Sequence, residues 1–106
     1  MSTRSGSRAR TVFRLAAGPR IGFGHLMRAR ALARALGVPA LVSIRGGRTA
    51  KRAARALGCR IVGDADTLKG ANLLIIDDPS LATARVWARR ARARGIWCAS
   101  IGDGGG

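Results

Sequence analysis

Short apolar runs alternate with stretches of helical periodicity along almost the whole chain, and this alternation constrains the fold more than any other feature. The predicted strands cover residues 11–17, 40–44, 59–62, 72–77 and 96–101. The predicted helices cover residues 25–36, 48–57 and 80–94. Strands that alternate with helices in this way pair in parallel through right-handed crossovers. We therefore expect an α/β, Rossmann-like three-layer sandwich whose five-stranded parallel sheet has the order 3-2-1-4-5.

The domain is expected to occupy residues 11–102, between a disordered basic tail at 1–10 and a flexible glycine-rich tail at 103–106. The first helix is predicted to bury one stripe of side chains: His25, Ala29, Leu32 and Leu36. The third helix is predicted to bury another stripe: Leu81, Ala84, Ala88 and Ala91. The two cysteines, Cys59 and Cys98, are expected to be buried free thiols, and Trp87 and Trp97 are expected to belong to the core.

Polar residues follow the first and fourth predicted strands. Gly22-Phe23-Gly24-His25 comes after the first strand, and the fourth strand ends in Asp77-Asp78. In a sheet of this order, ligands bind beyond the carboxyl ends of these two strands, where the direction of the strand order reverses. Gly22 and Gly24 permit a close approach of a ligand to the backbone, and the positive end of the helix dipole faces the same place. The sequence therefore predicts a binding site for an anionic substrate at this edge.

His25 is the only histidine and is placed on the first turn of the predicted helix. The helix dipole there favours a neutral ring, which can act as a general base; the alternative is a structural residue that packs at the helix start. Arg28, one turn later, is either a phosphate ligand or a solvated helix residue. Asp77 and Asp78 are candidates to orient a substrate hydroxyl or His25, although the role favoured for Asp78 is to cap the third helix.

Several common kinds of site are disfavoured. Met27 occupies the position of the third glycine of a dinucleotide fingerprint, and Arg45 follows the second strand where an acidic residue would hold a ribose. The G-K-[ST] of a phosphate-binding P-loop is also missing. We expect neither a cofactor nor a metal. No apolar run approaches the length of a membrane span, and a cytoplasmic location is expected.

The net charge is +15, and residues 1–60 contain fourteen Lys and Arg but no acid. Such a surface favours polyanions, although arginine in place of lysine and an abundance of alanine and glycine are also typical of a G+C-rich coding sequence. The few aromatic residues are not interleaved with arginines, so nucleic acid is an unlikely partner. A basic module that binds polyanions remains the alternative function.

The segment RLAAGPRIGFGHLMRARALARAL resembles the opening of the UDP-sugar hydrolases of pseudaminic-acid biosynthesis and of related spore-coat polysaccharide glycosyltransferase-like proteins. I-G-x-G-H-x-x-R follows the first strand of those proteins. The segments NLLIIDDPS and WCASIGDGGG resemble their later strands, so that the similarity spans residues 11–104. The family has a GT-B architecture of two Rossmann-like domains, and the resemblance implies that this chain is an incomplete N-terminal half of that fold.

The resemblance implies a function in which His25 activates water or an acceptor at the anomeric carbon of a UDP-sugar. Gly22 and Gly24 would then allow the substrate to approach the backbone closely, and Arg28 would lie at the edge of the site. The chain departs from the family at Ala16, where an aspartate usually stands nine residues before the histidine. A C-terminal domain, or a partner chain that supplies it, is expected to bind the nucleotide. An inactive truncated fragment is the remaining alternative.

Overall fold

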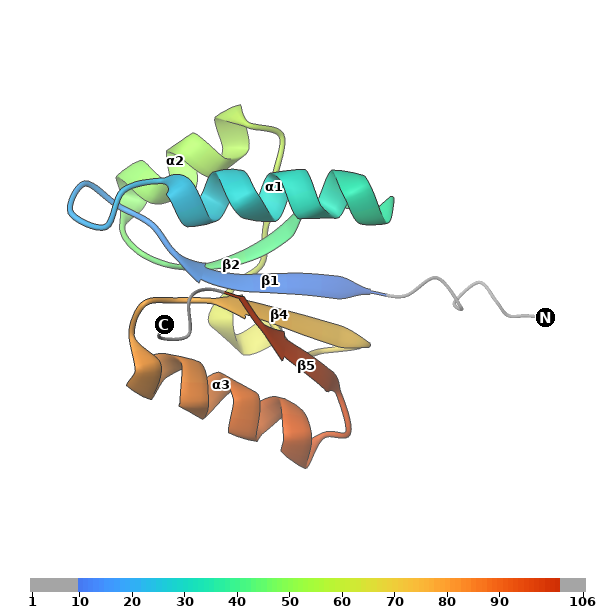
Figure 1. Cartoon of the computed structure of the whole chain (residues 1–106). Coiled ribbons are helices and arrows are strands. Elements are labelled where there is room, and N and C mark those ends of the chain that lie inside the picture. Colours follow the sequence, from blue (N-terminus) through green and yellow to red (C-terminus); the bar gives the residue numbers. More distant parts are fainter. Residues whose placement is uncertain (1–9, 102–106) are drawn as a thin grey trace.

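Five parallel strands form a single sheet at the centre of the computed structural model, which describes residues 10–101 (Figure 1). The strands are β1 (Thr11–Ala16), β2 (Leu41–Arg45), β3 (Arg60–Ile61), β4 (Leu73–Asp77) and β5 (Trp97–Ser100). Their order is β3-β2-β1-β4-β5, and the paired strands run parallel. The predicted fold class and strand order are confirmed.

The helices cover both faces of this sheet, which gives the molecule three layers (Figure 1). On one face lie α1 (Gly24–Leu36) and α2 (Arg48–Ala56), and on the other lies α3 (Leu81–Ala93). A short 3₁₀ helix, η2 (Asp64–Asp66), connects β3 to β4. Each face has its own hydrophobic core, because successive side chains of a strand point to opposite faces. Phe13 of β1 belongs to the core beneath α1 and α2, whereas its neighbour Val12 packs with Trp87 of α3.

The buried stripe of α1 differs from the prediction. Leu26, Ala29 and Ala33 are the buried residues, while Leu32 is only partly buried and Leu36 is exposed. Residues 26, 29 and 33 lie on one face at helical spacing, and the two alanines let the helix pack close to the sheet. His25 therefore lies beside the buried stripe rather than within it, at the end of the helix that faces the strand ends.

The start and the buried face of α3 also correct the prediction. Ser80, not Asp78, is the N-cap residue, and its side chain accepts a hydrogen bond from the Thr83 N–H. Trp87 and Ala91 are the buried residues, whereas Leu81 is largely exposed in the first turn. Ala84 and Ala88 are partly buried against the same core. The large indole of Trp87 fills space that the alanines of the predicted stripe would have left open, as expected of a core tryptophan.

β5 is an edge strand, and all four of its residues are exposed. The prediction of a buried thiol is wrong for Cys98, and the prediction of a core tryptophan is wrong for Trp97. Cys59, in contrast, is buried as predicted. β5 pairs only with β4 among the described residues, and α3 is the helix that contacts it. An apolar run at the edge of a sheet thus carries the sequence pattern of a central strand without its burial.

The basic tail was predicted to extend through residue 10, but Arg10 is held by the sheet. Its N–H donates to the Asn72 side chain, and its carbonyl oxygen accepts from the Asn72 and Leu73 N–H groups. Arg10 therefore belongs to the sheet region rather than to the predicted tail. Most of the first predicted tail and all of the second, with Asp103, lie outside the described residues.

Gly46, which follows β2, is required by close packing. A Cβ added there would lie far inside the contact distance of the Ala17 carbonyl oxygen, and backbone atoms cannot move aside as a flexible side chain can. We expect Gly46→Ala to lower the free energy of unfolding by about 1–3 kcal/mol, as overpacking generally does. Urea denaturation would measure the loss. Gly47→Ala is the matched control, because a Cβ at Gly47 meets no atom; equal stability of the two variants would contradict the expectation.

Candidate functional site

His25, Arg28 and Asp77 form a hydrogen-bonded cluster at the carboxyl ends of β1 and β4. β4 ends at Asp77, while His25 and Arg28 lie on the first turns of α1, which the loop after β1 leads into. His25 Nδ1 lies 2.8 Å from Asp77 Oδ1, and the Asp77 side chain is only 5% exposed. The structure thus joins three of the residues predicted from the ends of the first and fourth strands.

The hydrogen bond to Asp77 determines which nitrogen of the His25 ring can act as a base. A carboxylate only accepts hydrogen bonds, so the proton of a neutral ring must be on Nδ1 when that atom bonds to Asp77. Nε2 then carries the lone pair. The His25 side chain is 23% exposed, which leaves the ring accessible from solvent. A buried carboxylate that orients a partly exposed imidazole is an arrangement in which histidine acts as a general base in known triads.

Arg28 binds the same carboxylate through two donors. Its Nε lies 2.8 Å from Asp77 Oδ2 and its Nη2 lies 2.8 Å from Asp77 Oδ1, in the two-pronged geometry that arginine forms with carboxylates. Its Nη2 also lies 3.3 Å from His25 Nδ1. These bonds hold Asp77 in place and balance its charge. Arg28 was predicted to be a phosphate ligand or a solvated residue; the structure shows it holding the carboxylate.

The glycine loop reaches the site in a tight turn. Gly18 and Gly22 exchange backbone hydrogen bonds, and Gly22 has a φ of 88°, a conformation that favours glycine. The Gly22 N–H is thus committed to Gly18 rather than open to a ligand. Gly24 is the first residue of α1, which has no side-chain cap and no acidic residue in its first turn. The positive end of this helix therefore lies next to His25 without a compensating charge of its own.

Asp78 turns away from this cluster and pairs with Arg45. Arg45 Nε and Nη2 lie 2.8 and 2.7 Å from the two Asp78 oxygens, and the Asp78 side chain is 0% exposed. The Ser80 N–H donates a further bond of 2.8 Å. Burial raises the pKa of Asp78, but the bonds from Arg45 and Ser80 outweigh it and hold that pKa below its usual value. The ion pair of Asp78 with Arg45 therefore links the carboxyl ends of β4 and β2.

The sequence did not predict the ion pairs of Arg14 with Asp64 and of Arg45 with Asp78. Arg14 lies within β1, yet its side chain is buried, with Nη1 bonded to Asp64 at 2.6 Å and to Ser43 at 2.9 Å. The signal that could have revealed the pair of Arg14 is an arginine inside an apolar strand, because arginine is almost never buried without a partner. All four aspartates that the structure describes form ion pairs, three with arginines and one with Lys69.

Further observations bound the kind of site. Among residues 10–101, no group of three His, Cys, Asp or Glu side chains could hold a metal ion. The described helices include none that is long and apolar enough to cross a membrane. Neither the protein-family models nor the curated proteins contain a match to this chain.

Proposed function

We propose that this chain is the acceptor-side or water-activating domain of a nucleotide-sugar enzyme, in which His25 is the general base at the anomeric carbon of a UDP-sugar. The observation that carries the proposal is the 2.8 Å contact between His25 Nδ1 and the buried Asp77 carboxylate. The resemblance of the glycine-histidine segment to UDP-sugar hydrolases and to glycosyltransferase-like proteins of polysaccharide biosynthesis suggests the substrate class.

The chemistry follows from the orientation of the ring. Nε2 takes a proton from water or from an acceptor hydroxyl as that oxygen attacks the anomeric carbon, and the bond from this carbon to the UDP oxygen breaks. UDP leaves with the bonding electrons, and Asp77 stabilises the imidazolium that forms. Asp77 is thus a positioning residue, and Arg28 fixes its carboxylate. A second domain, as a partner chain or as further polypeptide, would bind the nucleotide.

Release of UDP from a panel of UDP-hexoses and UDP-N-acetylhexosamines tests the proposal. The chain is assayed alone and with a polypeptide that carries the second Rossmann-like domain. We expect His25→Gln to reduce release by roughly 10²–10⁴-fold, the range that general-base catalysis contributes. Gln keeps a side chain of similar size that can still bond to Asp77, so the fold should be retained.

Arg20→Gln is the control, because Arg20 is exposed in the glycine loop and forms no ion pair with the described carboxylates. Its UDP release should equal that of the unchanged chain. The proposal is contradicted if His25→Gln releases UDP at the same rate as the unchanged chain. It is equally contradicted if neither the chain alone nor the two polypeptides together release UDP from any sugar of the panel.

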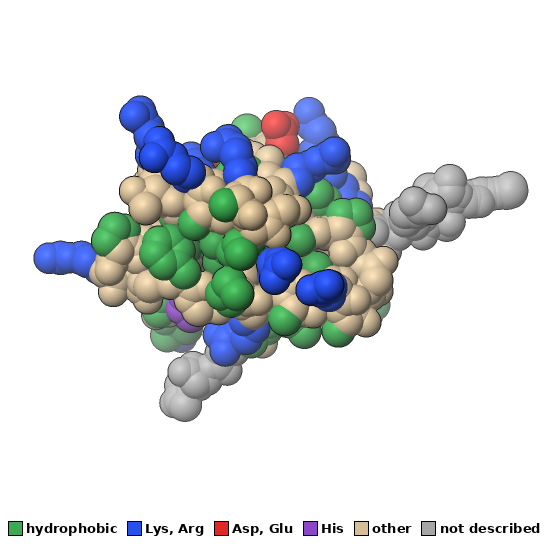
Figure 2. Space-filling view, turned by 90° about the horizontal axis from the view of Figure 1, so that it is seen from above, with side chains coloured by type: hydrophobic (Ala, Val, Ile, Leu, Met, Phe, Trp, Pro, Cys, Tyr) green, Lys and Arg blue, Asp and Glu red, His purple; other side chains and the backbone are tan. Residues whose placement is uncertain are grey.

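A second candidate function is the binding of a polyanion. The observation in its favour is that α1, α2 and α3 contain basic residues but no acidic residue. Figure 2, however, shows the basic side chains on the face that α1 and α2 cover as spread out, with hydrophobic side chains between them, rather than gathered in one patch. Binding to nucleic acid that weakens steeply with salt and is unchanged in His25→Gln would favour this function.

A further inference from the structure

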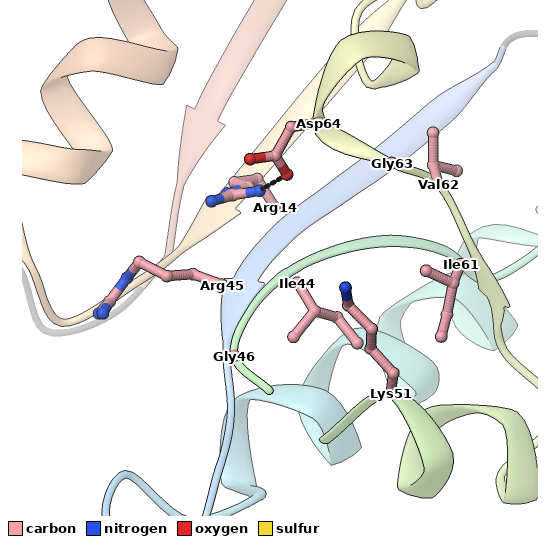
Figure 3. A pocket seen from close by; sticks show the side chains of 9 residues that line it. All are labelled: Arg14, Ile44, Arg45, Gly46, Lys51, Ile61, Val62, Gly63 and Asp64. Carbon is pink, nitrogen blue, oxygen red and sulfur yellow. Dashed lines mark hydrogen bonds and ion pairs between the residues drawn. The ribbon is translucent and has the colours of Figure 1, made fainter. Parts of the chain in front are cut away.

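A second hollow of the molecule lies where β2 and β3 end. It is a hollow of about 380 Å³, which we call the β2–β3 pocket. Figure 3 shows Arg14 and Asp64 on one side of it, with Lys51 reaching toward them from α2 on the opposite side. Ile44, Ile61 and Val62 form the apolar part of its wall. None of its lining residues belongs to the cluster of His25, Arg28 and Asp77.

Arg14 gives the β2–β3 pocket a buried cation whose hydrogen bonds are incomplete. Its guanidinium stacks on the Trp87 ring at 4.6 Å, and its Nη1 bonds to Ser43 and Asp64. Its Nε is buried and has no hydrogen-bond partner. A buried hydrogen-bond donor without an acceptor lowers the stability of the fold. An additional acceptor at this place would satisfy the guanidinium.

The charges of the other lining residues also favour an anion. Lys51 forms no ion pair with any of the described carboxylates. Arg45 is bound by Asp78, and Figure 3 shows its guanidinium directed away from the pocket. Among the residues that line the pocket, Asp64 is the one carboxylate beside Arg14 and Lys51, so these three side chains carry one positive charge in excess. α2 begins just beyond Gly46, without a side-chain cap or an acidic residue in its first turn. The positive end of its helix dipole therefore adds to the positive charge at the pocket.

We propose that the β2–β3 pocket binds a small organic phosphate, with the phosphate between Arg14 and Lys51 and the apolar part against Ile44, Ile61 and Val62. Arginine forms two-pronged hydrogen bonds with phosphate oxygens, and lysine adds a point charge. The volume of the hollow falls within the range of small-molecule sites, about 300–1,000 Å³. This ligand would bind independently of any reaction at His25.

Titration of the full chain with phenyl phosphate and with inorganic phosphate, followed by backbone amide NMR, tests the proposal. We expect phenyl phosphate to shift the amide signals of Gly46, Lys51 and Gly63 and to bind more tightly than inorganic phosphate, because its ring contacts the apolar wall. Lys51→Gln should weaken binding roughly tenfold, the effect of losing one charge-assisted hydrogen bond. Arg52→Gln, an exposed neighbour on α2 that does not line the pocket, should leave the affinity unchanged.

Asp64→Asn should strengthen the binding of phenyl phosphate, in contrast to Lys51→Gln. The asparagine oxygen still accepts a hydrogen bond from Arg14, but the negative charge that repels an anion is gone, so phenyl phosphate should bind roughly two- to fivefold more tightly. Unshifted signals at millimolar phenyl phosphate would overturn the proposal, as would equal affinity for the two phosphates. Shifts spread over all three helices that weaken equally in Lys51→Gln and Arg52→Gln would assign the binding to general surface charge. His25→Gln should change none of these results, which separates this proposal from the one for His25.

Discussion

Arg45→Met is expected to lower the free energy of unfolding by about 3 kcal/mol, a large share of the roughly 5–15 kcal/mol that stabilises a typical domain. The Asp78 side chain is fully buried and receives two bonds from Arg45 and one from the Ser80 N–H. Methionine fills a similar volume but leaves the buried carboxylate without its counterion. Breaking a buried ion pair on one side costs more than the pair itself contributes, because the remaining charge stays out of water.

The loss of stability in Arg45→Met should depend on pH, and the pKa of Asp78 determines the direction of that dependence. Burial raises that pKa, but Arg45 and Ser80 hold it below its usual value in the folded chain. The carboxylate therefore stabilises the fold above pH of about 4 and ceases to do so as the pH falls through the lowered folded pKa. In Arg45→Met, the bonds from Arg45 no longer offset the effect of burial on the pKa of Asp78. Protonation of Asp78 then removes the unpaired charge. The difference in stability between the two chains should thus be largest near neutral pH and shrink in acid.

Urea denaturation followed by tryptophan fluorescence measures these differences, because Trp87 is buried and Trp97 is already exposed in the folded chain. Arg52→Met is the matched control on an exposed arginine without an ion pair among the described residues, and it should change stability by less than about 0.5 kcal/mol. Adding Asp78→Asn to Arg45→Met should restore part of the lost stability, since the buried charge is removed. A loss at neutral pH that equals that of the control would show that the pair carries no stability.

The parts of the fold that the sequence predicted are those that depend on periodicity alone. The alternation of apolar runs with helical patterns, joined by right-handed crossovers, predicted a parallel sheet, and the strand order followed from the Rossmann-like fold that this alternation indicates. Which face of each helix is buried was harder to predict. The stripes of α1 and α3 consist largely of alanine, whose small side chain marks a buried face only weakly, so Leu36 and Leu81 were assigned to the core although they are exposed.

The sequence predicted which strand ends form the candidate site but not which side chains contact one another there. Topology places residues that follow β1 and β4 at one edge, which is why His25 and Asp77 could be predicted to meet. Which of two adjacent aspartates faces the helix depends on the alternation of side chains along β4 and on the available partners. Asp77 points to the side of α1, whereas Asp78 is drawn to Arg45 across the sheet edge. The sequence could not assign that pairing, because twenty basic residues compete for five acids.

Asp77→Asn is expected to change the tautomer of His25 and, with it, any general-base activity. In the unchanged chain the bond to Asp77 places the ring proton on Nδ1. An asparagine amide can donate to Nδ1 instead, which places the proton on Nε2 and removes the lone pair that would accept a proton from water. Loss of an orienting carboxylate in this way lowers turnover by roughly 10⁴-fold in enzymes with the same arrangement. UDP release should fall by a similar factor.

The tautomer can be measured without any substrate. His25 is the only histidine, so the ring ¹⁵N signals of the chain belong to it alone. We expect the protonated nitrogen to be Nδ1 in the unchanged chain and the Nε2-protonated form to gain population in Asp77→Asn. Arg28→Gln is the control, because it removes bonds to Asp77 but leaves the contact between Asp77 Oδ1 and His25 Nδ1. A ring protonated on Nε2 in the unchanged chain, or one that Asp77→Asn leaves as it was, would show that the carboxylate does not orient His25.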